Sequence, residues 1–253
     1  MLERILDATR GRLTELRSRR GVVMERAEAA PPPPSFEKAL TVPGLAVIAE
    51  IKRRSPSRGE LAPGLDPVEQ ARRYAEGGAE ALSVLTEPFF FSGDGDDLVA
   101  AREATGLPVL RKDFVLETVQ VWEARALGAS AVLLIVAAVS PRELSGLIED
   151  AAQAGIDPLV EVHTPEEAGI ALDVGARLIG VNNRDLTTFE VDLATAEEIG
   201  PLLSGASVAV AESGIYSRAD AARMQAAGFD AVLVGEALIR SGDPARLLHD
   251  LKG

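Results

Sequence analysis

Glu50 and Lys52 lie two residues apart at the end of an apolar run, Ala46 to Ile51, that is typical of a buried β-strand. Residues two apart on a strand point to the same side, so the carboxylate and the ammonium group share one face. Buried charges are costly unless they are paired or used. The pair is therefore either acid–base machinery or a salt bridge at a strand end, and this stretch alone leaves both readings open.

Polar residues also follow the later apolar runs of the chain. The strand ends carry Thr86, Glu87, Lys112, Glu161, Asn182, Arg184, Glu212 and Ser213. Each residue alone is most simply a solvated loop residue. Together, carboxylates and ammonium groups can hold and transfer protons, and their repetition at one end of so many strands predicts a shared acid–base site.

The last two strand ends have a different composition. Gly214 and Gly235 each stand just past an apolar run, where a backbone free of side chains can approach a phosphate group. The basic segment Arg53 to Gly59 could add positive charge near the same ligand. Glu236 does not fit this picture, and we expect its backbone to bind while its carboxylate turns away.

Most of the seven phenylalanines also follow predicted strands, namely Phe89, Phe90, Phe91, Phe114 and Phe189. They predict an apolar wall for a ring-shaped ligand at the strand ends. The alternative is packing beneath long loops, which we expect for at least one of the three consecutive residues.

Composition excludes several kinds of chemistry. The 253 residues contain no cysteine and only two histidines, His163 and His249, so thiolate chemistry, a His-rich metal site and a His-based triad are not expected. We interpret His163 as a loop residue rather than a catalyst. A net charge of −13 argues against nucleic-acid binding.

The expected location follows from apolar segments that the sequence lacks. No apolar run is long enough to span a membrane. The first thirteen residues lack the apolar segment of a signal peptide. We therefore expect a cytoplasmic protein without a membrane partner.

The elements that must position these residues alternate regularly between strand and helix. Predicted strands cover residues 46–51, 81–85, 108–111, 131–136, 158–162, 178–181, 207–211 and 231–234. Alternation of this kind indicates a parallel sheet, and eight units predict a closed (β/α)₈ barrel with its site at the carboxyl ends of the strands. An open doubly wound sheet is the alternative, although no G-x-G-x-x-G motif follows the first strand.

Helices are predicted between these strands from caps and stop signals. Asp66, Thr164 and Ser217 are expected N-caps, and further helices are expected from Asp96, over 117–127 and 141–154, near 193–199 and from Asp243. Residues 2–20 predict one amphipathic helix, and a polyproline linker follows it at 31–34. We expect a single barrel domain, 1–253, in which residues 1–45 form a helical extension packed on the barrel.

Eight short motifs occur in order at the eight predicted strands: IAEIKRRSPS, SVLTE, VLRKDF, LLI, LVEVH, GVNNRDL, VAESGI and VLVGEAL. Together they resemble the indole-3-glycerol phosphate synthase family of tryptophan biosynthesis. The resemblance extends over essentially the whole chain, including the N-terminal extension. It implies a carbon–carbon lyase that closes the pyrrole ring of 1-(2-carboxyphenylamino)-1-deoxyribulose 5-phosphate with loss of carbon dioxide and water. It also implies that no cofactor and no metal are needed.

The same resemblance assigns residues to roles. It implies that Lys112 is the acid at the ribulose carbonyl and that Lys52, Glu50 and Glu161 serve the later steps, with the step of each lysine left open. The remaining matches are Asn182 for orientation; Arg184, Glu212, Ser213, Ser55 and Pro56 for substrate contacts; Phe91, Phe114, Leu133 and Leu186 for the ring wall; and Ser55, Gly214, Gly235 and Glu236 for the phosphate. Glu236 departs from the small hydroxyl residue that is common in the family.

A general acid works best when its pKa lies near the working pH. We therefore expect burial or neighbouring cations to lower the pKa of the catalytic lysine. The cations expected to crowd the barrel mouth are Lys52, Arg53, Arg54, Arg111 and Lys112.

Two other functions remain as alternatives. Phosphoribosylanthranilate isomerase uses a similar phosphate-binding barrel. Its reaction needs a Cys/Asp acid–base pair, and this chain contains no cysteine. A catalytically inactive barrel that binds phosphosugars or a partner protein would not need the charged strand ends. The expected partner is a small phosphorylated substrate, and we expect a monomer, with a weak dimer as the alternative.

Overall fold

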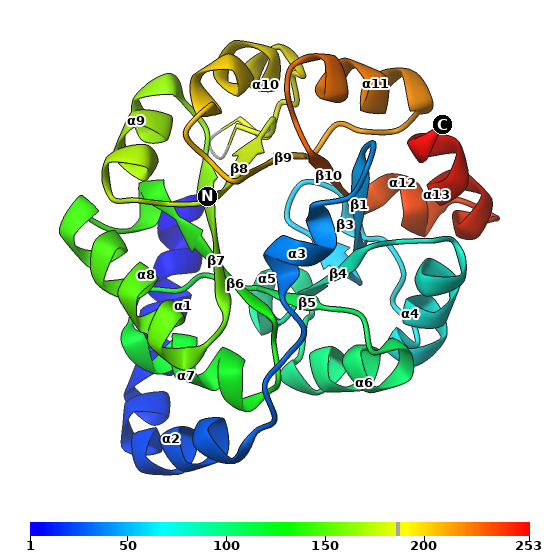
Figure 1. Cartoon of the computed structure of the whole chain (residues 1–253). Helices are drawn as coiled ribbons and strands as arrows, with labels where there is room; N and C mark the ends of the chain where they lie inside the picture. The colour runs from blue at the N-terminus through cyan, green and yellow to red at the C-terminus, as the bar shows by residue number, and fades with distance from the viewer. Residues whose placement is uncertain (186–187) are drawn as a thin grey trace.

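The computed structural model describes residues 1–185 and 188–253, and its centre is a closed barrel of parallel strands (Figure 1). The strands follow one another around the barrel in sequence order, and β1 closes it by pairing with both β4 and β10. They are β1 (Ala46–Ile51), β4 (Ala81–Leu85), β5 (Val109–Lys112), β6 (Ala131–Ile135), β7 (Asp157–Val162), β8 (Leu178–Asn182), β9 (Val208–Glu212) and β10 (Ala231–Val234). The predicted (β/α)₈ barrel is confirmed, and the open sheet is excluded.

Helices surround the barrel between successive strands (Figure 1). They are α4 (Pro67–Glu76), α6 (Gly95–Thr105), α7 (Thr118–Ala126), α8 (Pro141–Ala154), α9 (Pro165–Asp173), α10 (Ala194–Ile199), α11 (Arg218–Ala226) and α13 (Pro244–Lys252). Short helical turns add α5 (Pro88–Phe91), α12 (Glu236–Arg240), η1 (Val136–Ala138) and η2 (Gly200–Leu203). The N-caps Asp66, Thr164 and Ser217 each accept backbone N–H bonds as predicted.

The helix expected from Asp96 is present and begins one residue earlier, at Gly95, with Asp94 as its cap. One short helix was not predicted. Helix α5 lies where a loop was predicted, because Glu87 accepts hydrogen bonds from three consecutive backbone N–H groups and Pro88 suits the first helical turn.

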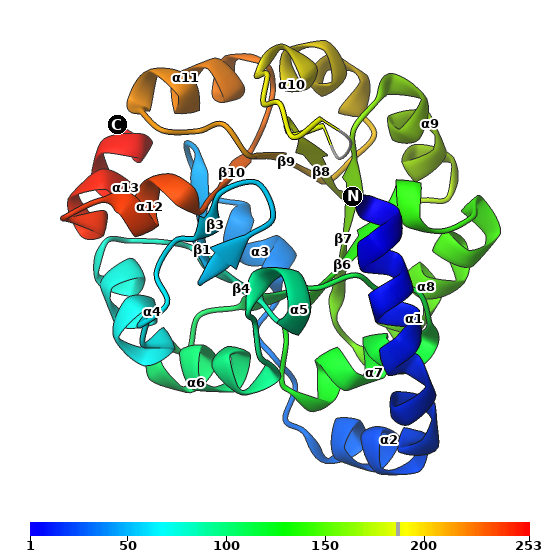
Figure 2. The same ribbon diagram turned by 180° about the vertical axis from the view of Figure 1, so that it is seen from behind.

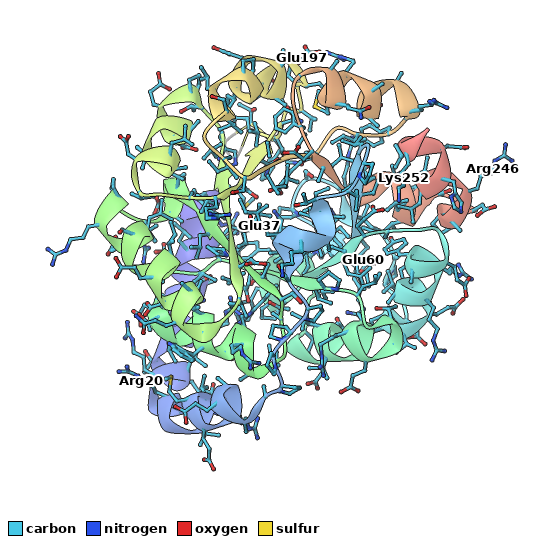
Figure 3. The ribbon with its side chains drawn as sticks, viewed as in Figure 1. Arg20, Glu37, Glu60, Glu197, Arg246 and Lys252 are labelled. Carbon is cyan, nitrogen blue, oxygen red and sulfur yellow. The ribbon has the colours of Figure 1, made fainter. Side chains whose placement is uncertain are left out.

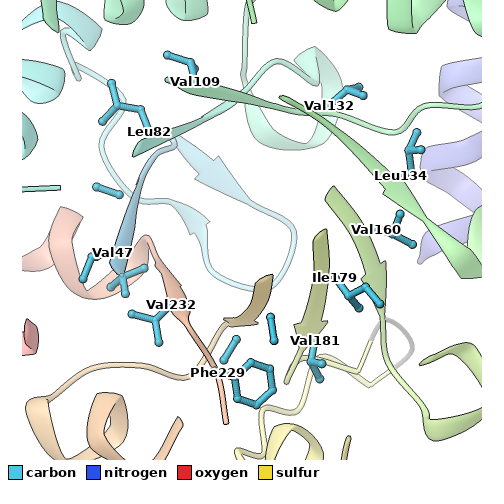
Figure 4. Close-up of a cluster of buried hydrophobic side chains, with 14 of the residues drawn as sticks. Val47, Leu82, Val109, Val132, Leu134, Val160, Ile179, Val181, Phe229 and Val232 are labelled. Carbon is cyan, nitrogen blue, oxygen red and sulfur yellow. The ribbon is translucent and has the colours of Figure 1, made fainter. Parts of the chain in front are cut away.

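The core has two layers, because alternate residues of each strand point to opposite sides. Val47, Leu82, Val132, Ile179 and similar residues point outward and pack beneath the helices (Figure 4). The other set, which includes Ile48, fills the barrel interior. Polar residues that share the inward parity are therefore directed to the barrel axis.

The N-terminal extension begins with two helices rather than the one predicted over 2–20. Helix α1 (Leu2–Ser18) ends before Arg19, and α2 (Arg20–Ala29) follows it and packs on α7. Arg12 in α1 donates to Asp113 just past β5 over 3.1 Å, so the extension is tied to the carboxyl ends of the strands.

Helix α3 (Phe36–Leu40) covers the opposite end of the barrel (Figure 1). Asp157 at the start of β7 accepts hydrogen bonds from the Phe36 and Glu37 backbone N–H groups over 2.9 and 3.0 Å. Phe36 and Leu40 join the interior layer of the core. This end of the barrel is therefore closed, and the site lies at the other end.

That other end is seen in Figure 2, with a small hairpin and helix α5 beside the barrel opening. The hairpin pairs β2 (Arg54–Ser55) with β3 (Gly59–Glu60), where the sequence predicted an irregular basic loop. Charged side chains such as Arg20 and Arg246 project from the outer helices (Figure 3). Over residues 1–185 and 188–253, no helix combines the length and apolar character needed to cross a bilayer.

Candidate active site

The inward parity of the strands brings the predicted acid–base residues together at one end of the barrel. Glu50 shares the inward side of β1 with Ile48, Lys112 shares that of β5 with Leu110, and Glu161 shares that of β7 with Leu159. Asn182 and Glu212 end β8 and β9 on the same side. These five residues line one cavity, which we name the mouth cavity.

Lys112 lies at the centre of this cluster. Its Nζ donates to Glu161 Oε2 over 2.7 Å and to Glu212 Oε2 over 2.5 Å. Asn182 Nδ2 donates to the other Glu161 oxygen over 3.2 Å. The side chains of Glu161 and Glu212 are 3% and 2% exposed, so one ammonium group serves two carboxylates that water barely reaches.

Glu50 and Lys52 form an ion pair beside this cluster, with side chains that are 6% and 16% exposed. The two residues therefore form the salt bridge that the first interpretation predicts. They also line the mouth cavity, as the acid–base interpretation requires.

Two glycines make room for the charged groups. A Cβ atom on Gly235 would clash with Glu50 Oε1 and lie 3.1 Å from Lys52 Nζ, and one on Gly180 would clash with Glu212 Oε1.

The electrostatics of Lys112 contradict the expected lowering of its pKa. Burial alone would lower the pKa of Lys112, but Glu161, Glu212 and Glu50 outweigh burial and raise it above its ordinary value. Burial and the nearby Glu161 raise the pKa of Glu212 to about 7, although Lys112 opposes the shift. For Glu161, burial is outweighed by Lys112 and His163, which lower its pKa. Carboxylates, rather than cations, therefore surround the lysine.

The prediction that five cations lie together at the barrel mouth was wrong for three of them. Arg53, Arg54 and Arg111 do not line the mouth cavity. Arg111 has the outward parity of β5 and pairs with Asp113 over 3.2 Å and Glu123 over 2.7 Å. Arg53 pairs with Asp97 over 2.9 Å, and Arg54 is exposed. The two-residue period of a strand could have excluded Arg111 from the sequence alone.

Apolar side chains line the mouth cavity together with the charged cluster. Phe91 and Phe114 lie with ring centroids 6.2 Å apart, and Leu133 also lines the cavity. Phe189 also lines the cavity, whereas Phe89 is exposed and Phe90 lies beneath Arg4 of α1. Such a wall suits a flat aromatic ligand.

The N-terminal extension also contributes to the lining, through Met1 and through Leu2 and Ile5 of α1. The sequence prediction did not include these residues. The apolar stripe of the first helix was their only signal.

Backbone and polar groups gather at the side of the cavity formed by β9, β10 and the hairpin. Ser55, Pro56, Ser213, Gly214 and Gly235 line this side. Gly214 and Gly235 lack side chains, and a Cβ atom at either position would clash with a neighbouring side chain, Val191 for Gly214 and Glu50 for Gly235.

Glu236 lines the same side, with its carboxylate engaged by cations. Its Oε1 lies 3.4 Å from Arg58 Nε and 3.1 Å from Arg240 Nε, and Tyr216 donates to its Oε2 over 3.4 Å. The two arginines compensate its negative charge on the side where the sequence predicts a phosphate.

All predicted site residues except one line this single cavity, Arg184 among them. Leu186 lies outside the described residues. Two other polar strand ends have structural contacts instead, because Thr86 bonds to Asp113 and Glu87 caps α5.

His163 was interpreted as a loop residue, yet it contacts the cluster from outside the mouth cavity. Its Nε2 lies 3.3 Å from Glu161 Oε1, and its Nδ1 lies 3.3 Å from Glu167 Oε2. The signal was present in the sequence, since His163 follows Glu161 by two residues just as Lys52 follows Glu50. Among the described residues, no group of three or more His, Asp or Glu side chains is arranged to hold a metal ion.

Comparison with solved structures identifies the same fold in proteins of low sequence identity. A 3-hexulose-6-phosphate synthase superposes with a TM-score of 0.64 at 16% identity, over 82% of this chain and 98% of that chain. A thiamine phosphate pyrophosphorylase from Pyrococcus furiosus gives 0.60 at 20% identity, over 86% and 96%. Fold and site together define a (β/α)₈-barrel protein with an acid–base cluster at the carboxyl ends of its strands.

Sequence comparison is more specific. The model of the family "Indole-3-glycerol phosphate synthase" matches residues 2–251. A relative of that name from Mycolicibacterium smegmatis is 52% identical over 229 residues, which cover 90% of this chain and 84% of the relative. "Indole-3-glycerol phosphate synthase 2" from Streptomyces coelicolor is 48% identical over 247 residues, covering 98% and 95%. The chain belongs to the indole-3-glycerol phosphate synthase family, whose members are carboxy-lyases of tryptophan biosynthesis.

Proposed function

We propose that the mouth cavity converts 1-(2-carboxyphenylamino)-1-deoxyribulose 5-phosphate to indole-3-glycerol phosphate, carbon dioxide and water. The observation that carries the proposal is Lys112, buried between Glu161 and Glu212 in a cavity that Phe91 and Phe114 also line. An acid and an aromatic-ring wall in one cavity suit a reaction in which a ring carbon attacks a carbonyl group.

The residues divide the reaction between them. Lys112 donates a proton to the ribulose carbonyl oxygen as the ring carbon attacks it, and the carboxylate on that carbon leaves as carbon dioxide. A lysine then protonates the departing hydroxyl while a carboxylate removes the neighbouring proton. Glu50, Lys52 and Glu161 are the candidates for this second acid–base step, since all three line the same cavity.

The remaining residues hold the substrate. Asn182 orients Glu161 through a hydrogen bond, and Arg184 and Ser213 contact the sugar chain. The phosphate binds against Ser55 and the backbones of Gly214, Gly235 and Glu236, where backbone N–H groups can be approached.

The raised pKa of Lys112 is compatible with this role. Carboxylates keep the free ammonium group charged, so Lys112 enters the reaction with its proton in place. Transfer to the substrate is favoured once the carbonyl oxygen develops negative charge beside this largely buried ammonium group.

An assay with synthetic substrate tests the proposal directly. The wild-type protein should generate the fluorescence of an indole product, and Lys112→Ala should abolish turnover while retaining the fold and weak binding of product. A folded wild-type protein that binds the substrate without turnover would instead support an inactive barrel. Near-normal turnover by the variant would refute the role of Lys112.

The proposal also includes a cytoplasmic monomer that binds neither nucleic acid nor membrane. Its net charge of −13 disfavours contact with nucleic acids and anionic lipids. Light scattering at micromolar concentrations tests the monomer against the weak dimer.

A further inference from the structure

A histidine contacts Glu161 from a neighbouring pocket, which shares Asn182 with the mouth cavity. His163 follows β7, and its side chain is 11% exposed. It does not line the mouth cavity with Glu161 and Lys112. His163 is therefore placed to act on the reaction only through another residue.

Both ring nitrogens of His163 face carboxylates. Nε2 lies 3.3 Å from Glu161 Oε1, and Nδ1 lies 3.3 Å from Glu167 Oε2. A neutral imidazole carries one N–H donor, whereas an imidazolium carries two. A ring held between two carboxylates is therefore best matched by the charged form.

The position of the ring is fixed from the helix side. Glu167 Oε2 also accepts a hydrogen bond from the His163 backbone N–H over 2.7 Å, and Thr164 caps α9 between them. Ring and backbone of His163 are thus bound to the same carboxylate. This geometry leaves Nε2 within ion-pair distance of Glu161 Oε1, at 3.3 Å, but without a well-aligned hydrogen bond to it.

We propose that His163 is a positioning residue, an imidazolium clamped between Glu167 and Glu161 that keeps Glu161 ionised and aimed at Lys112. The proposal rests on the proposed function, in which Glu161 serves as a carboxylate. It extends the cluster into a continuous line of alternating charge: Glu167, His163, Glu161, Lys112 and Glu212.

Other groups act on the same line. Glu161 faces Lys112 from β5 and Asn182 from β8, and Glu212 on β9 shares the Lys112 ammonium. Glu50 on β1 adds its charge to the environment of Lys112. Burial would lower the pKa of His163, but Glu161 and Glu167 outweigh it and raise the pKa to about 10, in agreement with the geometry.

Nitrogen-15 NMR of the histidine rings tests the charge without reference to turnover. The chain has two histidines, so a His249→Gln variant assigns the spectrum. We expect both His163 ring nitrogens to remain protonated at pH 8, and Glu167→Gln to lower the pH at which the ring loses its proton. A neutral His163 ring at pH 8 in the wild-type protein would overturn the proposal.

Kinetics of His163→Gln test the effect on Glu161. Glutamine can keep an N–H group near Nε2 but carries no charge, so Glu161 should take up a proton at higher pH. We expect kcat at pH 7 to fall roughly tenfold or more, since an oriented acid–base group contributes about 10²–10⁴-fold. KM should stay nearly constant, because His163 does not line the mouth cavity.

The pH profile separates positioning from a purely structural role. The acidic limb of kcat should move to higher pH in His163→Gln and stay in place in the control His249→Gln. An unchanged limb with unchanged kcat would refute the coupling to Glu161. Absence of turnover in the wild-type protein would refute the proposed function instead, and the NMR result would still decide the charge of His163.

Discussion

Replacement of Lys112 by methionine removes the one ammonium group that Glu161 and Glu212 share. Methionine keeps most of the side-chain volume, so the change is electrostatic rather than steric. Loss of one partner from a buried ion pair costs about 3–5 kcal/mol. Because Lys112 is only 12% exposed and its partners less, we expect the unfolding free energy at pH 8.5 to fall by roughly that amount.

The deficit should depend on pH through Glu212. Its pKa in the folded protein is raised to about 7 and should rise further once Lys112 is removed. A carboxyl group with a raised folded-state pKa stabilises the fold at low pH, and this contribution is lost as the pH rises through that pKa. Between pH 7 and 8.5 the wild-type protein has already lost the stabilising contribution of protonated Glu212, whereas the variant is still losing it. The deficit should therefore differ between pH 6 and pH 8.5 by roughly 1–2 kcal/mol, since one proton corresponds to about 1.4 kcal/mol per pH unit.

Urea unfolding, followed by the fluorescence of the single tryptophan, Trp122, measures the deficit at both pH values. The matched control is the double variant Lys112→Met/Glu212→Gln, which also removes one of the two uncompensated carboxylates. The double variant should be more stable than the single variant at pH 8.5, but it should still lack turnover. The single variant should lose both stability and turnover. Equal deficits at pH 6 and pH 8.5 would refute the electrostatic reasoning, and turnover within tenfold of wild type would refute the catalytic one.

Three further predictions follow from the geometry of the cluster. Gly180→Ala should lower kcat by at least about tenfold, because the added Cβ atom would displace the Glu212 carboxylate. A kcat equal to that of the wild-type protein in steady-state kinetics would contradict this. Glu236→Gln removes a negative charge beside the phosphate side and should lower KM by roughly two- to fivefold, most strongly at low salt; an unchanged KM across salt concentrations would argue against a phosphate there. Because the pKa of His163 is raised in the folded protein, the charged ring stabilises the fold. This contribution is fully present below pH 6.5 and is lost as the pH rises toward 10. The wild-type protein should therefore lose about 2–4 kcal/mol relative to His163→Gln over that window, and parallel urea curves at pH 6.5 and 9.5 would contradict it.

The eight strands could be predicted from the sequence because each is a short apolar run between strong turn and cap signals. The predicted bounds of β1, β4 and β10 match the structure, and those of the other five strands differ by one residue at one or both ends. Short elements held by hydrogen-bonding side chains were harder. Glu87 caps α5 and Arg19 separates α1 from α2, but neither interrupts the apolar pattern on which the prediction depended.

The sequence by itself determined which residues could meet at the barrel mouth, since strand parity and the position of a residue at a strand end are local properties of the chain. The apolar runs alone place Glu50, Lys112 and Glu161 at strand ends. Only the tertiary structure decided their charges. Three carboxylates from three different strands surround Lys112 and raise its pKa, whereas the expected crowd of arginines lies outside the cavity. The physical reason is that a pKa depends on burial and on neighbours across the barrel, which are set by closure of the sheet and not by any one segment.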